Sequence, residues 1–245
     1  MLFFKRNPDP VQTEGFLACI GTDLHSHLLP AVDDGVQDTA TSIHFMRQLQ
    51  AWGIRHFITT PHIKSERYDN SPATLQPAYE QLQAAMREEG LNVPLHYAAE
   101  YYLDETIDER LTQPLLTLKD KLVLVEVSMA FSQAPMYQWL FQLETAGYQP
   151  LLAHPERYMY MHENFSQYET IRSKGVQLQV NLLSLAGYYG KPIQKIAERL
   201  IDAKLVDYVG TDIHHHKHLE ALEELGQRRK IVRMLETYGF KNQQL

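Results

Sequence analysis

Short apolar runs alternate with longer amphipathic stretches along the chain from about residue 16 onward. Seven of the runs are rich in Val, Ile, Leu, Phe and Tyr and are too short for helices, which predicts strands. The predicted strands cover residues 16–24, 55–61, 95–100, 121–127, 148–153, 176–182 and 206–212. Helical patterns lie between or after them, at residues 38–52, 72–89, 136–146, 164–174, 192–203 and 217–237.

Strands that alternate with helices predict a parallel sheet whose connections are right-handed. Seven such units favour an α/β fold of the closed type, a distorted TIM-like (β/α)7 barrel, over an open sheet. No glycine-rich nucleotide-binding loop follows any predicted strand, which also disfavours the open folds. Residues 5–14 are polar and contain two prolines, so we expect an irregular lead-in over residues 1–15 followed by one domain over residues 16–245.

Side chains that can bind metal ions stand at the ends of these predicted strands. In an α/β barrel the carboxyl ends of the strands face one mouth, so residues far apart in sequence converge there. The candidate ligands are His25, His27, Asp34, His62, Glu100, His154, Asp212 and His214. The alternative is that each is only a hydrogen-bonded polar residue at a strand end.

The ligand types and their number narrow the expected cofactor. Imidazole and carboxylate without thiolate suit Mn²⁺, Fe²⁺ or Zn²⁺ better than Ca²⁺ or Mg²⁺ alone. Eight candidate ligands exceed the needs of one ion, so we expect two or three divalent ions. Glu100 is the natural bridge, because each carboxylate oxygen can hold a separate ion.

An arginine accompanies these candidate ligands. Arg157 follows the fifth predicted strand, and a guanidinium can fork onto two phosphate oxygens. Several cations beside a fixed arginine suit a dianionic phosphate, with a metal-activated water as nucleophile. An ion pair with Glu156 is the alternative for Arg157. Glu126 and Asn181 end two further strands, either as ligands or as partners of ligand histidines.

Charge and cysteine content exclude some other classes of protein. The formal net charge of −7 disfavours nucleic acid as the partner. The single cysteine, Cys19, excludes a disulfide framework and indicates a reducing compartment, so we expect a cytoplasmic protein. The sixth residue after Cys19 is His25, where a cysteine-dependent phosphatase needs arginine. No apolar run reaches the length of a transmembrane helix.

At the strand ends the sequence resembles the polymerase and histidinol phosphatase (PHP) family. Within that family it is most similar to the bacterial manganese-dependent protein-tyrosine phosphatases linked to capsule and exopolysaccharide synthesis. Six motifs carry the resemblance: Asp23-Leu24-His25-Ser26-His27, Leu29-Pro30-Ala31-Val32-Asp33-Asp34-Gly35, Thr59-Thr60-Pro61-His62, Ala99-Glu100-Tyr101-Tyr102, Ala153-His154-Pro155-Glu156-Arg157-Tyr158 and Gly210-Thr211-Asp212-Ile213-His214.

The resemblance implies a phosphomonoester hydrolase, with Mn²⁺ favoured as the metal and a phosphotyrosine protein as the substrate. It implies one ion held by the set His25, His27, Glu100 and Asp212. It implies a second ion at His62 and His154 that shares Glu100, and a third completed by Asp34 and His214. Arg157 would bind the phosphate.

One position departs from the family pattern. Relatives carry an arginine shortly after the last motif, whereas this chain has His215-His216-Lys217-His218. We therefore expect Lys217 or one of these histidines to contact the substrate. Tyr102 either walls the leaving-group pocket or packs at its rim.

Other functions remain open from the sequence alone. Within the family they are a small-molecule phosphatase, for histidinol phosphate or a sugar phosphate, and a phosphodiesterase. Outside it they are a metal amidohydrolase, which also carries His-x-His on its first strand, and a metal-binding module without catalytic activity.

Overall fold

The computed structural model describes residues 15–130 and 135–245, so nearly all of the predicted lead-in at residues 1–15 lies outside the described residues. The strands are β1 (Thr22–Asp23), β2 (His56–Thr59), β3 (His62–Ile63), β4 (Leu95–Tyr97), β5 (Glu100–Tyr102), β6 (Leu122–Glu126), β7 (Gln149–Ala153), β8 (Gln177–Asn181) and β9 (Tyr208–Gly210). The α-helices are α1 (Thr39–Ala51), α2 (Pro72–Glu88), α3 (Ile107–Arg110), α4 (Met136–Thr145), α5 (Ser166–Ser173), α6 (Leu182–Ala186), α7 (Lys191–Asp202), α8 (His216–Gly226) and α9 (Arg229–Tyr238). Three short 3₁₀ helices are η1 (Pro155–Arg157), η2 (Met159–Met161) and η3 (Lys241–Gln244).

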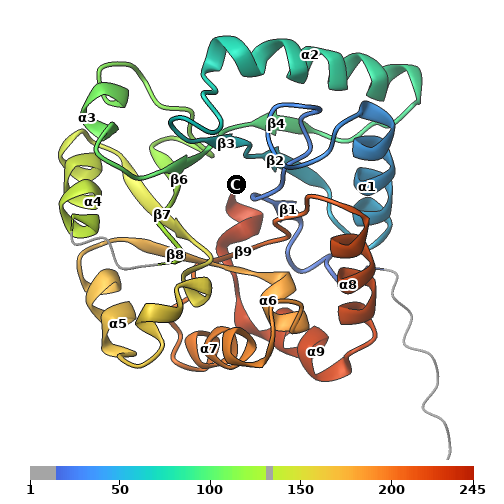
Figure 1. Ribbon diagram of the computed structural model, residues 1–245. Helices are drawn as coiled ribbons and strands as arrows, with labels where there is room; N and C mark the ends of the chain where they lie inside the picture. The colour runs from blue at the N-terminus through green and yellow to red at the C-terminus, as the bar shows by residue number, and fades with distance from the viewer. Residues whose placement is uncertain (1–14, 131–134) are drawn as a thin grey trace, which may run out of the picture.

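The strands form two parallel sheets, with the orders β1-β2-β4 and β3-β5-β6-β7-β8-β9. Figure 1 shows the strands arranged around a centre, with the longer helices on the outside. An isolated parallel bridge joins Ser26, just after β1, to Ile213, just after β9. The mixed α/β class and the parallel strands are therefore confirmed.

Two predicted strands are each broken into two short ones. The run at residues 55–61 becomes β2 and then β3, and the run at residues 95–100 becomes β4 and then β5. Pro61 lies at the first break and has no N–H to donate. Hydrogen bonds still cross this region, because Ala98 N donates to Thr59 O and Glu100 N donates to Pro61 O.

Two other predictions of secondary structure are wrong. Residues 16–20 form turns rather than a strand, although Phe16, Leu17 and Ile20 are buried in the core. A short apolar run looks the same in a buried turn as in a strand. The helix predicted at residues 217–237 is two helices, α8 and α9, separated at Gln227 and Arg228.

Two of the longer helices, α1 and α2, begin at residues whose side chains cap them. The Asp38 side chain accepts a hydrogen bond from Thr41 N at 2.7 Å, and Ser71 and Thr74 form a capping box at the start of α2. Among the described residues, no helix is long and apolar enough to cross a bilayer.

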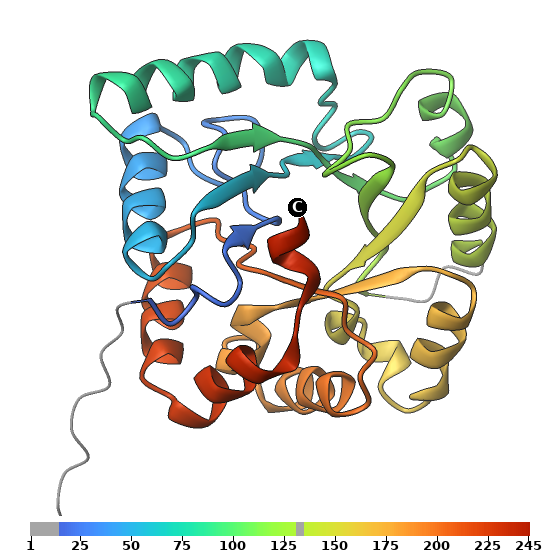
Figure 2. The same ribbon diagram turned by 180° about the vertical axis from the view of Figure 1, so that it is seen from behind.

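The amino ends of the strands are covered by the C-terminal segment, as Figure 2 shows from behind. Asn242 on η3 is buried, and its side-chain amide donates to Thr22 O and Val209 O. A small apolar cluster, including Leu24, Ile58 and Leu124, lies between the strands, and Leu245 packs against it. The polar residues at the carboxyl ends of the strands are left to form the site.

Candidate metal centre and active site

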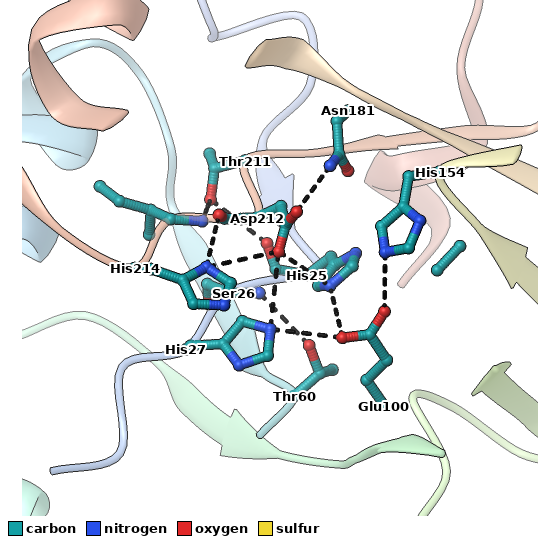
Figure 3. Close-up of polar contacts among 12 residues, drawn as sticks. His25, Ser26, His27, Thr60, Glu100, His154, Asn181, Thr211, Asp212 and His214 are labelled. Atoms are coloured by element: carbon teal, nitrogen blue, oxygen red, sulfur yellow. Dashed lines mark hydrogen bonds and ion pairs between the residues drawn. The ribbon is translucent and has the colours of Figure 1, made fainter. Parts of the chain in front are cut away.

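The carboxylate of Glu100 lies at the centre of four histidines from different parts of the chain. Its Oε2 atom is 3.2 Å from His25 Nε2, 3.4 Å from His27 Nε2 and 3.2 Å from His62 Nδ1. Its Oε1 atom is 3.0 Å from His154 Nε2. Figure 3 shows the rings of His25, His27 and His154 around Glu100.

Four side-chain atoms enclose one space, and Glu100 Oε2 is one of them. The other three are His25 Nε2, His27 Nε2 and Asp212 Oδ1. Asp212 Oδ1 is 3.3 Å from His25 Nε2 and 3.6 Å from His27 Nε2. Tetrahedral ligands about 2.1 Å from a metal ion are separated from one another by about 3.4 Å. The four histidine–carboxylate separations are close to this value, and His25, His27 and Asp212 form a group whose ligand atoms all lie within 4.8 Å of one another.

Further groups of donor atoms surround this first set. Their members are His25, Glu100 and His154; His62, Glu100 and Glu126; and His27, Asp34, His62 and His214, with ligand atoms within 4.8 Å of one another in each group. All eight predicted ligands thus lie in one region. His62 and His154 face different oxygens of Glu100. Glu126 Oε1 lies 3.4 Å from His62 Nδ1, and Glu126 Oε2 lies 3.8 Å from His154 Nε2.

Several of these buried atoms have no hydrogen-bond partner. In the described part of the chain, these include His25 Nε2, His27 Nε2, His62 Nδ1 and Glu100 Oε2. Buried polar atoms in folded proteins are almost always hydrogen-bonded. Unpartnered nitrogens and a carboxylate oxygen that point at one another fit cation ligands, and this favours a metal centre over ordinary polar strand ends.

The electrostatics of the cluster also fit a cation. Burial lowers the pKa of His25, but the charges of Glu100 and Asp212 outweigh burial and raise it to about 9. Burial raises the pKa of Glu126 well above its usual range, and the neighbouring charge of Glu100 adds to the effect. Crowded carboxylates thus stabilise positive charge in this space, and divalent ions would supply it.

A chain of hydrogen bonds on β8 orients two of the ligands. His25 Nδ1 donates to Gln179 Oε1 at 2.9 Å, and Gln179 Nε2 donates to Asn181 Oδ1 at 2.9 Å. Asn181 Nδ2 then donates to Asp212 Oδ2 at 2.6 Å. Asn181 therefore contacts a candidate ligand, although that ligand is an aspartate and not the histidine expected from the sequence. Gln179 was not anticipated, because it lies inside a strand rather than at its end.

Asp33 has the same role on the other side of the centre. Its Oδ2 lies 2.7 Å from His27 Nδ1 and accepts from the backbone N–H of His62 at 2.9 Å. Burial raises the pKa of Asp33, but His27 outweighs this and lowers it below its usual range. The ionised carboxylate therefore fixes the ring of one ligand and the backbone of another.

Two candidate ligands have a backbone conformation that is uncommon for residues other than glycine. His154, just after β7, has φ 34°, and Asp212, just after β9, has φ 51°. Such strained positions are concentrated at functional sites. Asp23 helps to hold the second of them, because its carboxylate accepts from Thr211 N at 3.0 Å and from Thr211 Oγ1 at 2.7 Å.

A cavity of about 350 Å³ opens over the cluster. Arg157 lines it, with NH1 3.1 Å from Asp212 Oδ2 and its guanidinium carbon 4.2 Å from the centroid of the Tyr189 ring. The ion-pair partner of Arg157 is Asp212, and Glu156 instead accepts from Ser184 Oγ and Asn181 N. Arg157 therefore lies beside the donor cluster and faces the space above it.

The other two predicted substrate contacts, Lys217 and Tyr102, are not among the residues that line this cavity. Lys217 is exposed on α8 and is not among the residues that line the cavity, whereas His215 and His218 are. Tyr102 is half-buried, and its ring is 3.6 Å from the ammonium of Lys64. Tyr189 and Met129 also line the cavity and were not anticipated, because neither belongs to a strand-end motif.

The sequence matches one family model over most of its length. The family described as "Capsular polysaccharide synthesis, CpsB/CapC" matches residues 21–233. The chain belongs to this family, which confirms the resemblance drawn from the six motifs.

Named relatives agree with this assignment. The tyrosine-protein phosphatase YwqE of Bacillus subtilis is 37% identical over 201 residues, which cover 80% of this chain and 78% of the relative. The tyrosine-protein phosphatase CpsB of Streptococcus pneumoniae is 25% identical over 200 residues, which cover 79% and 82%.

Solved structures show the same fold. A structure from the work on YwqE and CpsB, described there as unique metal-dependent tyrosine phosphatases, matches with a TM-score of 0.77 and 31% identity over 87% of this chain and 89% of the other. An amidohydrolase from Mycoplasma synoviae matches with a TM-score of 0.53 at 10% identity, over 95% and 88%, which shows likeness of fold alone.

Proposed function

We propose that this protein is a metal-dependent protein-tyrosine phosphatase that hydrolyses phosphotyrosine in a protein substrate. The observation that carries the proposal is the set of unpartnered donors around Glu100 with Arg157 beside it. Family membership and the names of the relatives support the same activity. Residues 16–245 would form the catalytic domain, and we expect it to act in the cytoplasm.

We further propose that the two sheets act as one distorted seven-stranded barrel. In this description β2 with β3, and β4 with β5, each count as one bent strand. The bridge between Ser26 and Ile213 supports closure between the first and last strands. A closed ring explains how ligands from β1 and β9, at opposite ends of the sequence, reach the same carboxylate.

Two or three divalent ions would be held by the eight predicted ligands, with Glu126 as a further candidate because of its place between His62 and His154. Mn²⁺ is favoured, and Fe²⁺ or Zn²⁺ suits the same donors. When bound, such ions polarise phosphoryl oxygens and lower the pKa of a water so that it can attack phosphorus.

The protein's own residues would bind and orient the phosphate. Arg157 is held between Asp212 and the Tyr189 ring, so its planar guanidinium is oriented before substrate arrives. A pre-positioned guanidinium stabilises the charge that develops on the phosphoryl oxygens. Gln179 and Asp33 keep the rings of His25 and His27 turned toward the cluster.

The substrate class is tested by comparing turnover of phosphotyrosine peptides, histidinol phosphate, a sugar phosphate and short DNA by the Mn²⁺-loaded protein. We expect the highest kcat/KM with the phosphotyrosine peptides. A preference for histidinol phosphate or the sugar phosphate would establish a small-molecule phosphatase. A preference for DNA would establish a phosphodiesterase, and turnover of none of them would leave a metal-binding module.

A further inference from the structure

Lys64 comes directly after β3, two residues beyond His62. His62 pairs with Glu100 across these strands, and Tyr102 pairs with Glu126 across the next pair. Side chains two residues apart along an extended chain face the same way, so Lys64 lies on the same side of its strand as His62, and Tyr102 on the same side as Glu100. Lys64 Nζ lies 3.6 Å from the centroid of the Tyr102 ring.

A tight turn fixes the position of Lys64 relative to the metal ligands. Lys64 N donates to Tyr68 O at 2.9 Å, and Tyr68 N donates to Lys64 O at 2.8 Å. The ring of Tyr68 stacks on His62 with an interplanar angle of 8°. The lysine backbone is therefore held against a residue of the centre itself.

The charge of Lys64 is not neutralised by a close ion pair. Over residues 15–130 and 135–245, no carboxylate oxygen lies within 4.0 Å of its ammonium. Its charge nonetheless acts on the buried carboxyl of Glu126, at the floor of the cavity. Lys64 is half-buried with its ammonium over an aromatic ring, and such a cation is suited to an anion.

Arg157 lies after β7, lines the cavity and contacts Asp212 after β9. We propose that Lys64 is the second cation of the phosphate subsite, and that its ammonium binds a phosphoryl oxygen while Arg157 binds others. This assignment rests on the proposed function. It deepens that function by naming a substrate contact that none of the six motifs contains.

Binding of inorganic phosphate tests the assignment without turnover. Isothermal titration calorimetry on the Mn²⁺-loaded protein should show about tenfold weaker phosphate binding for Lys64→Met, because one charged hydrogen bond is lost. Lys64→Arg should restore most of the affinity. Lys121→Met is the matched control, because Lys121 Nζ also lies over an aromatic ring, 5.2 Å from Tyr148, at the start of β6.

Equal phosphate affinity in wild type and Lys64→Met would overturn the proposal. Loss of metal from Lys64→Met would also overturn it, because the lysine would then act on the fold of the centre rather than on the anion. If the wild type binds phosphate but hydrolyses no phosphotyrosine peptide, the proposed function fails, and the phosphate titration still decides the role of Lys64.

Two phosphotyrosine peptides distinguish a contact of Lys64 with the phosphate from a contact with a carboxylate elsewhere in the substrate. One peptide carries acidic residues beside the phosphotyrosine, and the other carries neutral residues. Lys64→Met should raise KM about tenfold for both, with a smaller change in kcat, because the contact is already made in the bound substrate. A rise confined to the acidic peptide would assign Lys64 to a peptide carboxylate and contradict the proposal.

Discussion

Gln179 Oε1 accepts a hydrogen bond from Nδ1 of His25 at 2.9 Å, so the other ring nitrogen, Nε2, is left to face Glu100 and Asp212. This contact fixes both the tautomer and the rotation of the ring. Gln179 is fully buried and lies on the inner face of β8, below Asn181. A residue without any charge thus determines how a ligand presents its lone pair.

Replacing Gln179 should weaken metal binding without removing any ligand. Gln179→Met keeps the length of the side chain but removes the acceptor, and we expect metal affinity to fall roughly 10- to 100-fold. Competition with a chelator of known affinity measures this. Gln177→Met, on the same face of β8 toward its start, should bind metal like wild type. Equal affinities for the two variants would remove Gln179 from the support of the centre.

Glu100→Gln should cause the largest loss of metal of any single conservative substitution. The carboxylate faces three histidines through one oxygen and His154 through the other, and an amide can offer only one neutral oxygen. Elemental analysis should find less than half of the wild-type metal content. Glu105→Gln, at an exposed position of the same loop region, should retain full content. Normal metal content in Glu100→Gln would contradict a bridging role.

Arg157→Ala should lower kcat/KM roughly 10²-fold or more, about 2–4 kcal/mol of transition-state stabilisation. Metal content should not change, because the arginine contacts the outer oxygen of Asp212 and not the one that faces the histidines. Arg199→Ala is the matched control, since Arg199 lies over the Phe165 ring on exposed α7. Wild-type kinetics for Arg157→Ala would exclude it from the site.

Cys19→Ser should keep nearly full turnover. Cys19 lies in the turn before β1, and burial raises the pKa of its thiol, so little reactive thiolate is present at neutral pH. A thiol alkylator should likewise have little effect on phosphatase rate. Trapping of a covalent phosphoprotein, or loss of activity on alkylation that Cys19→Ser prevents, would show a thiol-based mechanism instead.

The site was more predictable from the sequence than the details of the strands. All eight predicted ligands converge because strand ends in a parallel sheet meet at one edge, whatever the exact length of each strand. Strand lengths depend on tertiary hydrogen bonds, and so the breaks at Pro61 and after Tyr97 were not visible in the pattern of apolar residues. The turn at residues 16–20 differs from the predicted strand because a buried turn and a strand can share the same short apolar run.

The supporting residues were the least predictable part. Gln179 and Lys64 carry no motif of their own, and their roles depend on which neighbour the fold places beside them. The contacts of His62 and His154 with opposite oxygens of Glu100 depend on the rotation of a single carboxylate. Spacing along the chain contains no information on such rotations. The role of Lys217 stays a prediction.

The most direct test of this account is phosphate release from a phosphotyrosine peptide by protein stripped with a chelator and then titrated with Mn²⁺. The account predicts no release above the uncatalysed rate in the stripped protein. Release should then rise with added Mn²⁺ and level off once the cluster around Glu100 is filled. Full activity in the presence of the chelator would contradict the central claim that this cluster is a catalytic metal centre.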